Sequence, residues 1–225
     1  MTGGKRASGA GGASVAAAKF TTACTLCPRL ADHLAKIRAE KPEYHARPVP
    51  PFGAQSPRVL VVGLAPGMHG ANRTGRPFTG DYAGLLLYET LHRYGYSNQP
   101  DGSDPHDGLA LHDCRITNAV KCLPPENKPT PAEVKLCNRY LAGEIDELAA
   151  GSAILALGRI AHDAVVQAVG ARRSQYAFAH GARHALPRGR LLFDSYHCSR
   201  YNTQTRRLTP EMFREVFEVL RQSVD

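Results

Sequence analysis

The chain runs VLVV from Val59 to Val62 and then GLAPGMHGANRTGRPFTGD from Gly63 to Asp81. The four apolar residues predict a fully buried strand. Glycines after it let the backbone approach a ligand closely, and ligand crevices lie at the carboxyl ends of strands in open α/β sheets. The same segment holds an aromatic ring, Phe78, and a carboxylate, Asp81. We therefore expect it to surround a substrate.

A second informative segment, HCSRYNTQT, extends from His197 to Thr205. The two segments resemble motifs A and B of the uracil-DNA glycosylase superfamily, and the long first segment is similar to that of the family 5 (type b) enzymes. The resemblance covers Cys24 to about Leu220. It implies an iron–sulfur glycosylase that removes uracil and some other deaminated bases.

Length and charge are compatible with this resemblance but do not establish it. A chain of 225 residues forms one large α/β domain or two small ones. The net charge of +8 favours a polyanionic partner such as DNA, although a merely basic soluble protein explains it equally well. We expect a disordered basic arm over residues 1–19 and a single domain over 20–225. No apolar run is long enough to span a bilayer, so we expect a cytoplasmic, nucleoid-associated monomer.

The order of apolar runs and helix signals predicts one doubly wound domain. Strands alternating with helices indicate a parallel sheet that is covered on both faces. The expected fold is a three-layer α-β-α sandwich around a mainly parallel four-stranded sheet. The strands are expected at Val59–Leu64, Arg115–Ala119, Ile154–Leu157 and Leu191–Phe193. Helices are expected within Thr22–Arg38, near Tyr82–Tyr94, from the capping box at Thr130, at Ile160–Val169 and from Thr209.

Cysteine spacing predicts a metal centre. The chain has six cysteines, which are unlikely to form disulfides in a cytosolic protein. Cys24 and Cys27 form a C-x2-C pair, and Cys122 and Cys137 follow with fourteen residues between them. Four thiolates hold either zinc or a [4Fe–4S] cluster, and the spacing alone favours the cluster modestly. The resemblance strengthens the preference for [4Fe–4S]. The alternative is that Cys122 and Cys137 are small buried apolar residues, as we expect for Cys114 and Cys198.

Cleavage of an N-glycosidic bond in DNA requires the nucleotide to be flipped into a pocket that reads the base. The sugar then gains oxocarbenium character, the base leaves as an anion, and water adds to the sugar. The resemblance implies that Phe78 is the platform for the base, with Gly63 beside it and Asn118 as the amide that reads the base edge. The alternative for Phe78 is that it packs in the core beneath the loop. Taken alone, an Asn at a strand end such as Asn118 is more often a turn or capping residue.

The charge-handling groups are expected to be His197 and Asp81. His197 would donate a hydrogen bond to the base oxygen on which negative charge accumulates, and a neutral imidazole suffices. Where many members of the superfamily carry an acidic or polar residue beside the first glycine, this chain has Leu64, which cannot activate water. Asp81 is therefore our candidate for orienting water or stabilising the cationic sugar. As an alternative, Asp81 is the N-cap of the next helix. Cys198 replaces the usual motif B proline and leaves the geometry of that turn open.

Basic and aromatic residues follow His197 and fit a loop that probes DNA. The expected DNA-binding residues are Arg200, Tyr201, Asn202, Arg206 and Arg207. In the first segment, His69, Asn72, Arg73 and Arg76 could reach phosphates or the flipped nucleotide, although charged loop residues are usually just solvated.

The resulting prediction is a monofunctional enzyme, because no lysine stands in an obvious Schiff-base position. Its substrate would be double-stranded DNA, and also single-stranded DNA, that carries uracil, with hypoxanthine and xanthine as further bases. Two alternatives come from other classes. One is a non-catalytic nucleic-acid-binding module with a structural metal site, and the other is an iron–sulfur redox protein.

Overall fold

One six-stranded sheet organises the part of the chain that the computed structural model describes, residues 19–224. The strand order is β1-β3-β2-β4-β6-β5. The inner four strands run parallel, whereas β1 and β5 pair antiparallel at the two edges. The strands are β1 (Phe52–Gly53), β2 (Val59–Gly63), β3 (Cys114–Asn118), β4 (Ala153–Leu157), β5 (Arg183–Ala185) and β6 (Leu191–Ser195).

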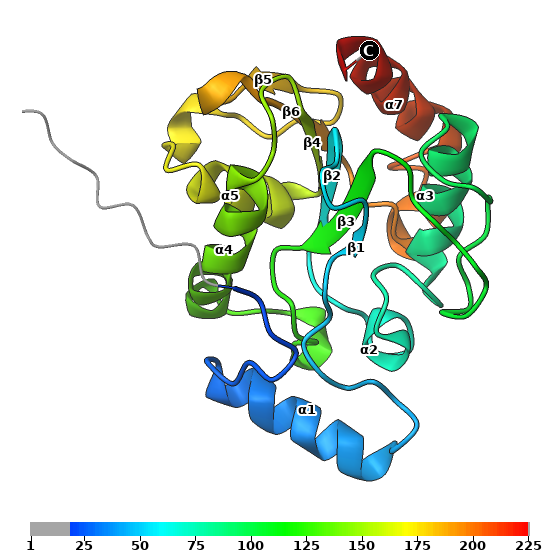
Figure 1. Ribbon diagram of the computed structural model, residues 1–225, viewed down its shortest axis with the longest axis vertical. Coiled ribbons are helices and arrows are strands. Elements are labelled where there is room, and N and C mark those ends of the chain that lie inside the picture. Colours follow the sequence, from blue (N-terminus) through cyan, green and yellow to red (C-terminus); the bar gives the residue numbers. More distant parts are fainter. Residues whose placement is uncertain (1–18, 225) are drawn as a thin grey trace, which may run out of the picture.

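Helices cover both faces of this sheet, which gives three layers (Figure 1). One face is covered by α3 (Tyr82–Arg93) and α7 (Pro210–Val224), and the other by α4 (Pro131–Asp146) and α5 (Arg159–Ala168), with α1 (Pro28–Glu40) joining the core on that side. The shorter elements are α2 (Ala71–Thr74), α6 (Arg200–Gln204) and the 3₁₀ turns η1 (Pro125–Asn127), η2 (Arg173–Gln175) and η3 (Pro187–Gly189).

The side chains of β2 explain why both faces must be covered. Successive residues of a strand point to opposite faces, and here both sets are apolar. Val59 and Val61 pack in the core formed with α3 and α7. Leu60 and Val62 pack in the core formed with α1, α4 and α5. Each of the four is fully buried, as the continuous apolar run predicted.

The strand order reverses between β2 and β4, because β3 lies on one side of β2 while β4 and β6 follow on the other. In doubly wound sheets a ligand crevice forms at such a reversal, beyond the carboxyl ends of the strands. The segment Gly63–Asp81 leaves the sheet at this point. The turn after β4 contains Gly158, whose φ of 94° is in the region that favours glycine.

The predicted fold class is confirmed, and the four predicted strands are the four parallel strands of the sheet. The expectation of only four strands missed the short antiparallel edges β1 and β5. The capping box at Thr130 is present, since Thr130 accepts from the Glu133 N–H and Glu133 accepts from the Thr130 N–H. Cys114 and Cys198 are fully buried, as expected. The expected arm, residues 1–19, lies outside the described residues apart from Lys19.

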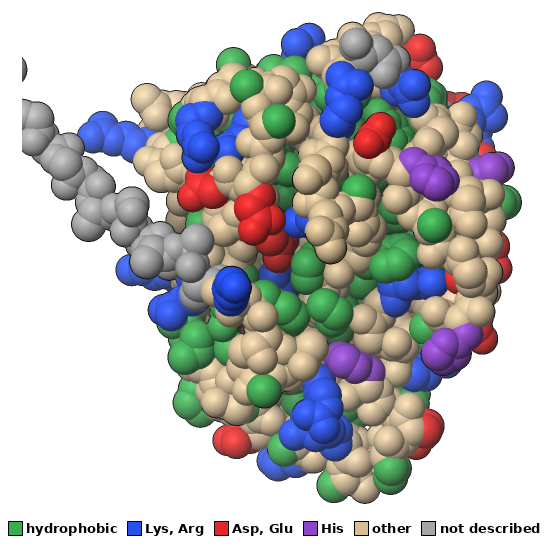
Figure 2. All heavy atoms as spheres, viewed as in Figure 1, with side chains coloured by type: hydrophobic (Ala, Val, Ile, Leu, Met, Phe, Trp, Pro, Cys, Tyr) green, Lys and Arg blue, Asp and Glu red, His purple; other side chains and the backbone are tan. Residues whose placement is uncertain are grey.

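On the face that Figure 2 shows, basic side chains lie at several places rather than in one patch. Acidic side chains lie between them on the same face. Over residues 19–224, none of the helices reaches the length and hydropathy of a membrane span.

Candidate active site

A cavity of about 440 Å³ opens at the carboxyl ends of the central strands. Phe78 and Asp81 reach it from the segment after β2, Asn118 from the end of β3, and His197 from the turn after β6. Its volume lies within the range of small-molecule sites. The structure thus brings together the four side chains that the sequence analysis assigned to base recognition and catalysis.

Gly63 allows Phe78 and Asn118 to meet at the floor of the cavity. A Cβ atom at Gly63 would collide with Asn118 Oδ1 and would lie 2.9 Å from the Phe78 ring. Phe78 itself has a φ of 58°, a left-handed conformation that a bulky residue adopts only when its surroundings impose it. The Phe78 ring therefore packs closely against the backbone of Gly63.

Asn118 has an unused hydrogen-bonding atom inside the cavity. Its side chain is 3 % exposed, and Oδ1 has no hydrogen-bond partner among the described residues. A buried amide oxygen without a partner is costly. A ligand that presents an N–H group at this point would satisfy it, as the edge of a nucleobase does.

His197 stands beside Phe78 and is uncharged at neutral pH. The two rings are nearly parallel, with an interplanar angle of 23° and centroids 5.9 Å apart. Burial lowers the pKa of His197 to about 4, since a low-dielectric environment disfavours the imidazolium. Its backbone is held by Asn202, whose side-chain amide donates to His197 O at 2.8 Å. His197 can therefore offer a neutral, preorganised N–H donor.

Asp81 occupies the N-cap position of α3, yet its side chain makes no capping hydrogen bond to that helix. The carboxylate instead lies against the backbone of Gly67 and Gly70. A Cβ at Gly70 would overlap it, and one at Gly67 would approach Oδ1 to 2.8 Å. Burial raises the pKa of Asp81, while the Ala71 N–H partly offsets that effect. The carboxylate is therefore directed into the cavity rather than used to begin α3.

Comparison with known proteins identifies the family to which this arrangement belongs. The family model of the uracil DNA glycosylase superfamily matches residues 50–221. The chain belongs to the uracil-DNA glycosylase superfamily. A type-5 uracil-DNA glycosylase of Thermus thermophilus is 52 % identical over 200 residues, which are 87 % of this chain and 91 % of the relative. The corresponding enzyme of Mycobacterium leprae is 43 % identical over 86 % of this chain and 88 % of its own length. A type-4 uracil-DNA glycosylase of Pyrobaculum aerophilum is 37 % identical over 58 % of this chain and 59 % of its own.

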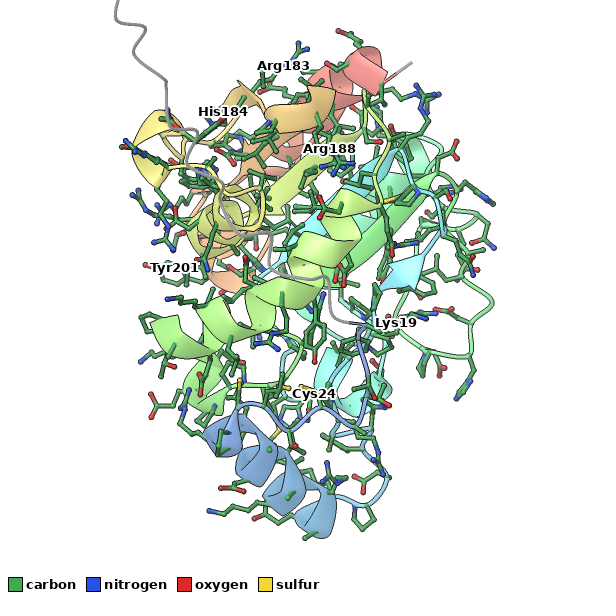
Figure 3. All side chains as sticks on the ribbon, turned by 60° about the vertical axis from the view of Figure 1, so that its left-hand side comes forward. Lys19, Cys24, Arg183, His184, Arg188 and Tyr201 are labelled. Carbon is green, nitrogen blue, oxygen red and sulfur yellow. The ribbon has the colours of Figure 1, made fainter. Side chains whose placement is uncertain are left out.

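In this member of the superfamily, motif B presents an exposed aromatic side chain beside the cavity. Tyr201 is 71 % exposed and projects from the edge of the molecule (Figure 3). The Arg200 guanidinium lies over the Tyr82 ring at 5.9 Å, and the Arg207 guanidinium lies over the Tyr196 ring at 4.7 Å. Arg206 is exposed. Asn202, which is also expected to bind DNA, is half-buried, and its side-chain amide donates to His197 O.

Two side chains of motif A are not available to phosphates, so that expectation is wrong for Asn72 and Arg76. Asn72 is fully buried. Arg76 is 7 % exposed and donates to both carboxylate oxygens of Asp107, at 2.9 and 2.7 Å. This pair lowers the pKa of Asp107 and fixes the Gly95–Asp107 loop against motif A. His69 and Arg73 are exposed as expected.

The cavity also has lining residues that the sequence analysis did not propose. Tyr82 and Ser199 border it next to Asp81 and Cys198, and Asn127 reaches it from η1. Asn127 has a φ of 57°, a conformation that Asn tolerates better than most residues. Its place in a Pro-rich turn after a cysteine was the signal available in the sequence.

The four cysteines proposed as metal ligands gather between α1 and α4. Cys24, Cys27, Cys122 and Cys137 border one small cavity of about 20 Å³, and Figure 3 shows Cys24 there with further sulfur atoms nearby. Two donors already point at the sulfurs: Tyr140 OH donates to Cys24 Sγ at 3.3 Å, and Lys121 N–H donates to Cys137 Sγ at 3.3 Å.

The spacing of the four cysteine sulfurs can be compared with that of a zinc site. A single tetrahedral zinc with Zn–S bonds of about 2.3 Å holds its thiolates about 3.8 Å apart. In the described residues no three of these cysteine sulfurs lie within 4.8 Å of one another, and the one group of potential ligands that meets this limit is His162, His184 and Asp194. The four sulfurs therefore do not have the spacing of a closed tetrahedral zinc site.

The group of His162, His184 and Asp194 is explained by hydrogen bonds within the protein. His162 Nδ1 lies 2.7 Å from Asp194 Oδ1, and its Nε2 lies 3.0 Å from the carbonyl oxygen of Tyr176. Both ring nitrogens thus face acceptors, which favours the doubly protonated ring. Although burial opposes it, the bond to Asp194 leaves the pKa of His162 raised.

Proposed function

We propose that this protein is a monofunctional uracil-DNA glycosylase that flips uracil out of DNA and hydrolyses its N-glycosidic bond. One observation carries the proposal. One cavity at the reversal of strand order is surrounded by a neutral imidazole, a buried amide whose oxygen has no partner among the described residues, an aromatic ring and a half-buried carboxylate. These are the groups that stacking, edge recognition, leaving-group stabilisation and attack on the sugar require.

Each side chain has a distinct role in this reaction. The base stacks on Phe78, and the Asn118 amide pairs with its edge. His197 donates to the base oxygen that becomes negative as the bond breaks, which is most effective in a water-poor site with the donor already placed. Asp81 stabilises the positive charge that develops on the sugar and orients the attacking water. Leu64 lines the cavity but offers no polar group.

The cysteine set is proposed to hold a [4Fe–4S] cluster through Cys24, Cys27, Cys122 and Cys137. Four thiolates are the ligands of such a cluster, and these four cysteines border one cavity between α1 and α4. When bound, the cluster joins the α1 region to α4 and supplies structural stability, because hydrolysis of an N-glycosidic bond transfers no electrons.

The decisive experiment measures release of free base from an oligonucleotide with one uracil, in U:G, U:A and single-stranded forms. We expect free uracil and an intact abasic strand that breaks only after alkali treatment. Parallel duplexes with hypoxanthine and xanthine define the range of bases. Tight DNA binding without base release would point to a binding module, and strand cleavage without alkali would contradict a monofunctional enzyme.

Replacing Tyr201 by Ala is expected to slow uracil release from duplexes several-fold more than release from single strands. An exposed ring that enters the helix stabilises the extruded nucleotide, and a single strand has no helix to open. Single-turnover rates on the two substrates provide the measurement. Val219→Ala, which shortens another exposed apolar side chain on α7, is the control and should change neither rate. Equal losses on both substrates would assign Tyr201 to protein packing instead.

A further inference from the structure

Lys121 is buried in a place where the proposed reaction does not use it. Its side chain is 1 % exposed, and Nζ donates to Glu144 Oε1 on α4 at 2.6 Å. Nζ also bonds to Thr117 Oγ1 in β3. The lysine side chain therefore runs back along the chain and closes a loop from residue 121 to residue 117. Asn118, whose amide faces the cavity, lies inside that loop.

The backbone of the same segment is tied to three parts of the protein. Ala119 N–H donates to Gly63 O at 2.9 Å, and Val120 N–H donates to Leu64 O at 3.0 Å, which joins the segment to motif A. Lys121 O accepts from the Val49 N–H at 2.7 Å, and Lys121 N–H donates to Cys137 Sγ at 3.3 Å. The next residue is Cys122. The five consecutive residues from Asn118 to Cys122 thus connect the active-site cavity to the cysteine site.

Stability alone does not account for a buried ion pair here. Desolvation of two charges offsets most of their attraction, and apolar residues of similar volume are often as stabilising. Glu144 Oε2 is moreover buried without a hydrogen-bond partner in residues 19–224, a further unfavourable contribution. The ion pair instead fixes the position of Nζ relative to α4, the helix that carries Cys137. Because Nζ also bonds to Thr117, the turn at Asn118 is held in place as well.

We propose that Lys121 is a positioning residue that holds the Asn118 amide in its base-reading orientation and couples the cysteine site to the substrate cavity. The role of Asn118 in this inference rests on the proposed function. Lys121 acts through Thr117 and Glu144 and does not contact the substrate. Loss of its charge would let the turn relax, and misplacement of a recognition group by about 1 Å lowers a rate up to about 100-fold.

The test uses the full-length, metal-loaded protein and three sets of variants. Lys121→Met removes the charge, and Lys121→Met with Glu144→Met removes both charges without leaving a buried carboxylate unpaired. Asn118→Ala and its combination with Lys121→Met complete a double-mutant cycle. Arg190→Met is the matched control. Arg190 is buried like Lys121, at 2 % exposed, and it anchors a turn through Leu148 O and Asp146 O. This turn lies at the opposite side of the sheet, at the amino-terminal end of β6.

Four quantities are measured: single-turnover uracil release, inhibition by free uracil, iron per chain, and the NMR signal of the Asn118 side-chain amide. We expect Lys121→Met to slow release on the order of tenfold, to weaken inhibition by uracil and to move the Asn118 signal. The variant that lacks both charges should show the same changes and retain its iron. In the Asn118→Ala background, Lys121→Met should slow uracil release less than about threefold, because the group that Lys121 positions is gone. Arg190→Met should lower the melting temperature only.

Two results would overturn the inference. One is an unmoved Asn118 signal in both Lys121 variants. The other is an equal loss of rate from Lys121→Met with and without Asn118. Failure of the proposed function looks different, since the wild-type protein would then release no uracil while the Asn118 signal still responded to Lys121→Met.

Discussion

Replacement of Asp81 by Asn is expected to lower single-turnover uracil release on the order of 100-fold or more without lowering the melting temperature. Loss of one preorganised charged group in an active site has effects of this size. Asn retains the shape of the side chain and can still accept from the Ala71 N–H. Folding should persist because the Asp81 side chain makes no capping bond to α3.

The raised pKa of Asp81 also predicts how Asp81→Asn changes the stability of the protein. Burial holds a proton on the folded-state carboxyl more tightly than in the unfolded chain. The stability that this provides is present below the unfolded-state pKa and is lost as the pH rises through the folded-state pKa. At neutral pH the ionised carboxylate is therefore unfavourable for folding, and Asp81→Asn should melt at the same or a higher temperature.

The pH–rate profile separates Asp81 from His197. The rate should fall as the pH drops through the raised pKa of Asp81, because only the carboxylate stabilises a cationic sugar. His197, with a pKa of about 4, is neutral above that pH. His197→Ala should thus lower the rate and keep the acid limb, whereas Asp81→Asn should abolish the limb. Full activity of Asp81→Asn with a lower melting temperature would show that Asp81 serves only the fold.

The sequence predicted the parallel sheet because four apolar runs are each long enough to be recognised. β1 and β5 could not be found in this way, since they have two and three residues. β5 is the polar stretch Arg183–Ala185, whose outer residues are exposed. These strands form because they pair with β3 and β6. Such pairing is a tertiary effect, which the periodicity of apolar residues does not reveal.

The sequence likewise predicted one part of the candidate active site and not another. The motifs placed Phe78, Asn118 and His197 at strand ends, and parallel strands necessarily bring those ends together. Spacing did not decide whether Asp81 faced a helix or a cavity, because the answer depends on Gly67 and Gly70 leaving room for its carboxylate. Nor did it predict burial of Arg76, which follows from Asp107, 31 residues away in sequence.

Loss of a cluster ligand is expected to have the largest effect on the protein itself. Cys137→Ala should yield insoluble or unstable protein, whereas the wild type should be brown and contain about four iron per chain. Cys137 lies inside α4 and Cys27 immediately before α1, so a cluster bound by both would join two helices that are far apart in sequence. Metal bound only by the native state stabilises that state. Iron and zinc analysis after anaerobic purification, with the visible spectrum, provides the measurement.

Cys114→Ala is the matched control for this prediction. Cys114 is fully buried in β3 but lies outside the group of four, so its replacement removes only one small buried side chain. It should keep the iron and the colour and lower the melting temperature slightly. Stoichiometric zinc without iron in the wild type would contradict the cluster. So would a soluble Cys137→Ala protein with full iron content, because it would show that the metal is held without this thiolate.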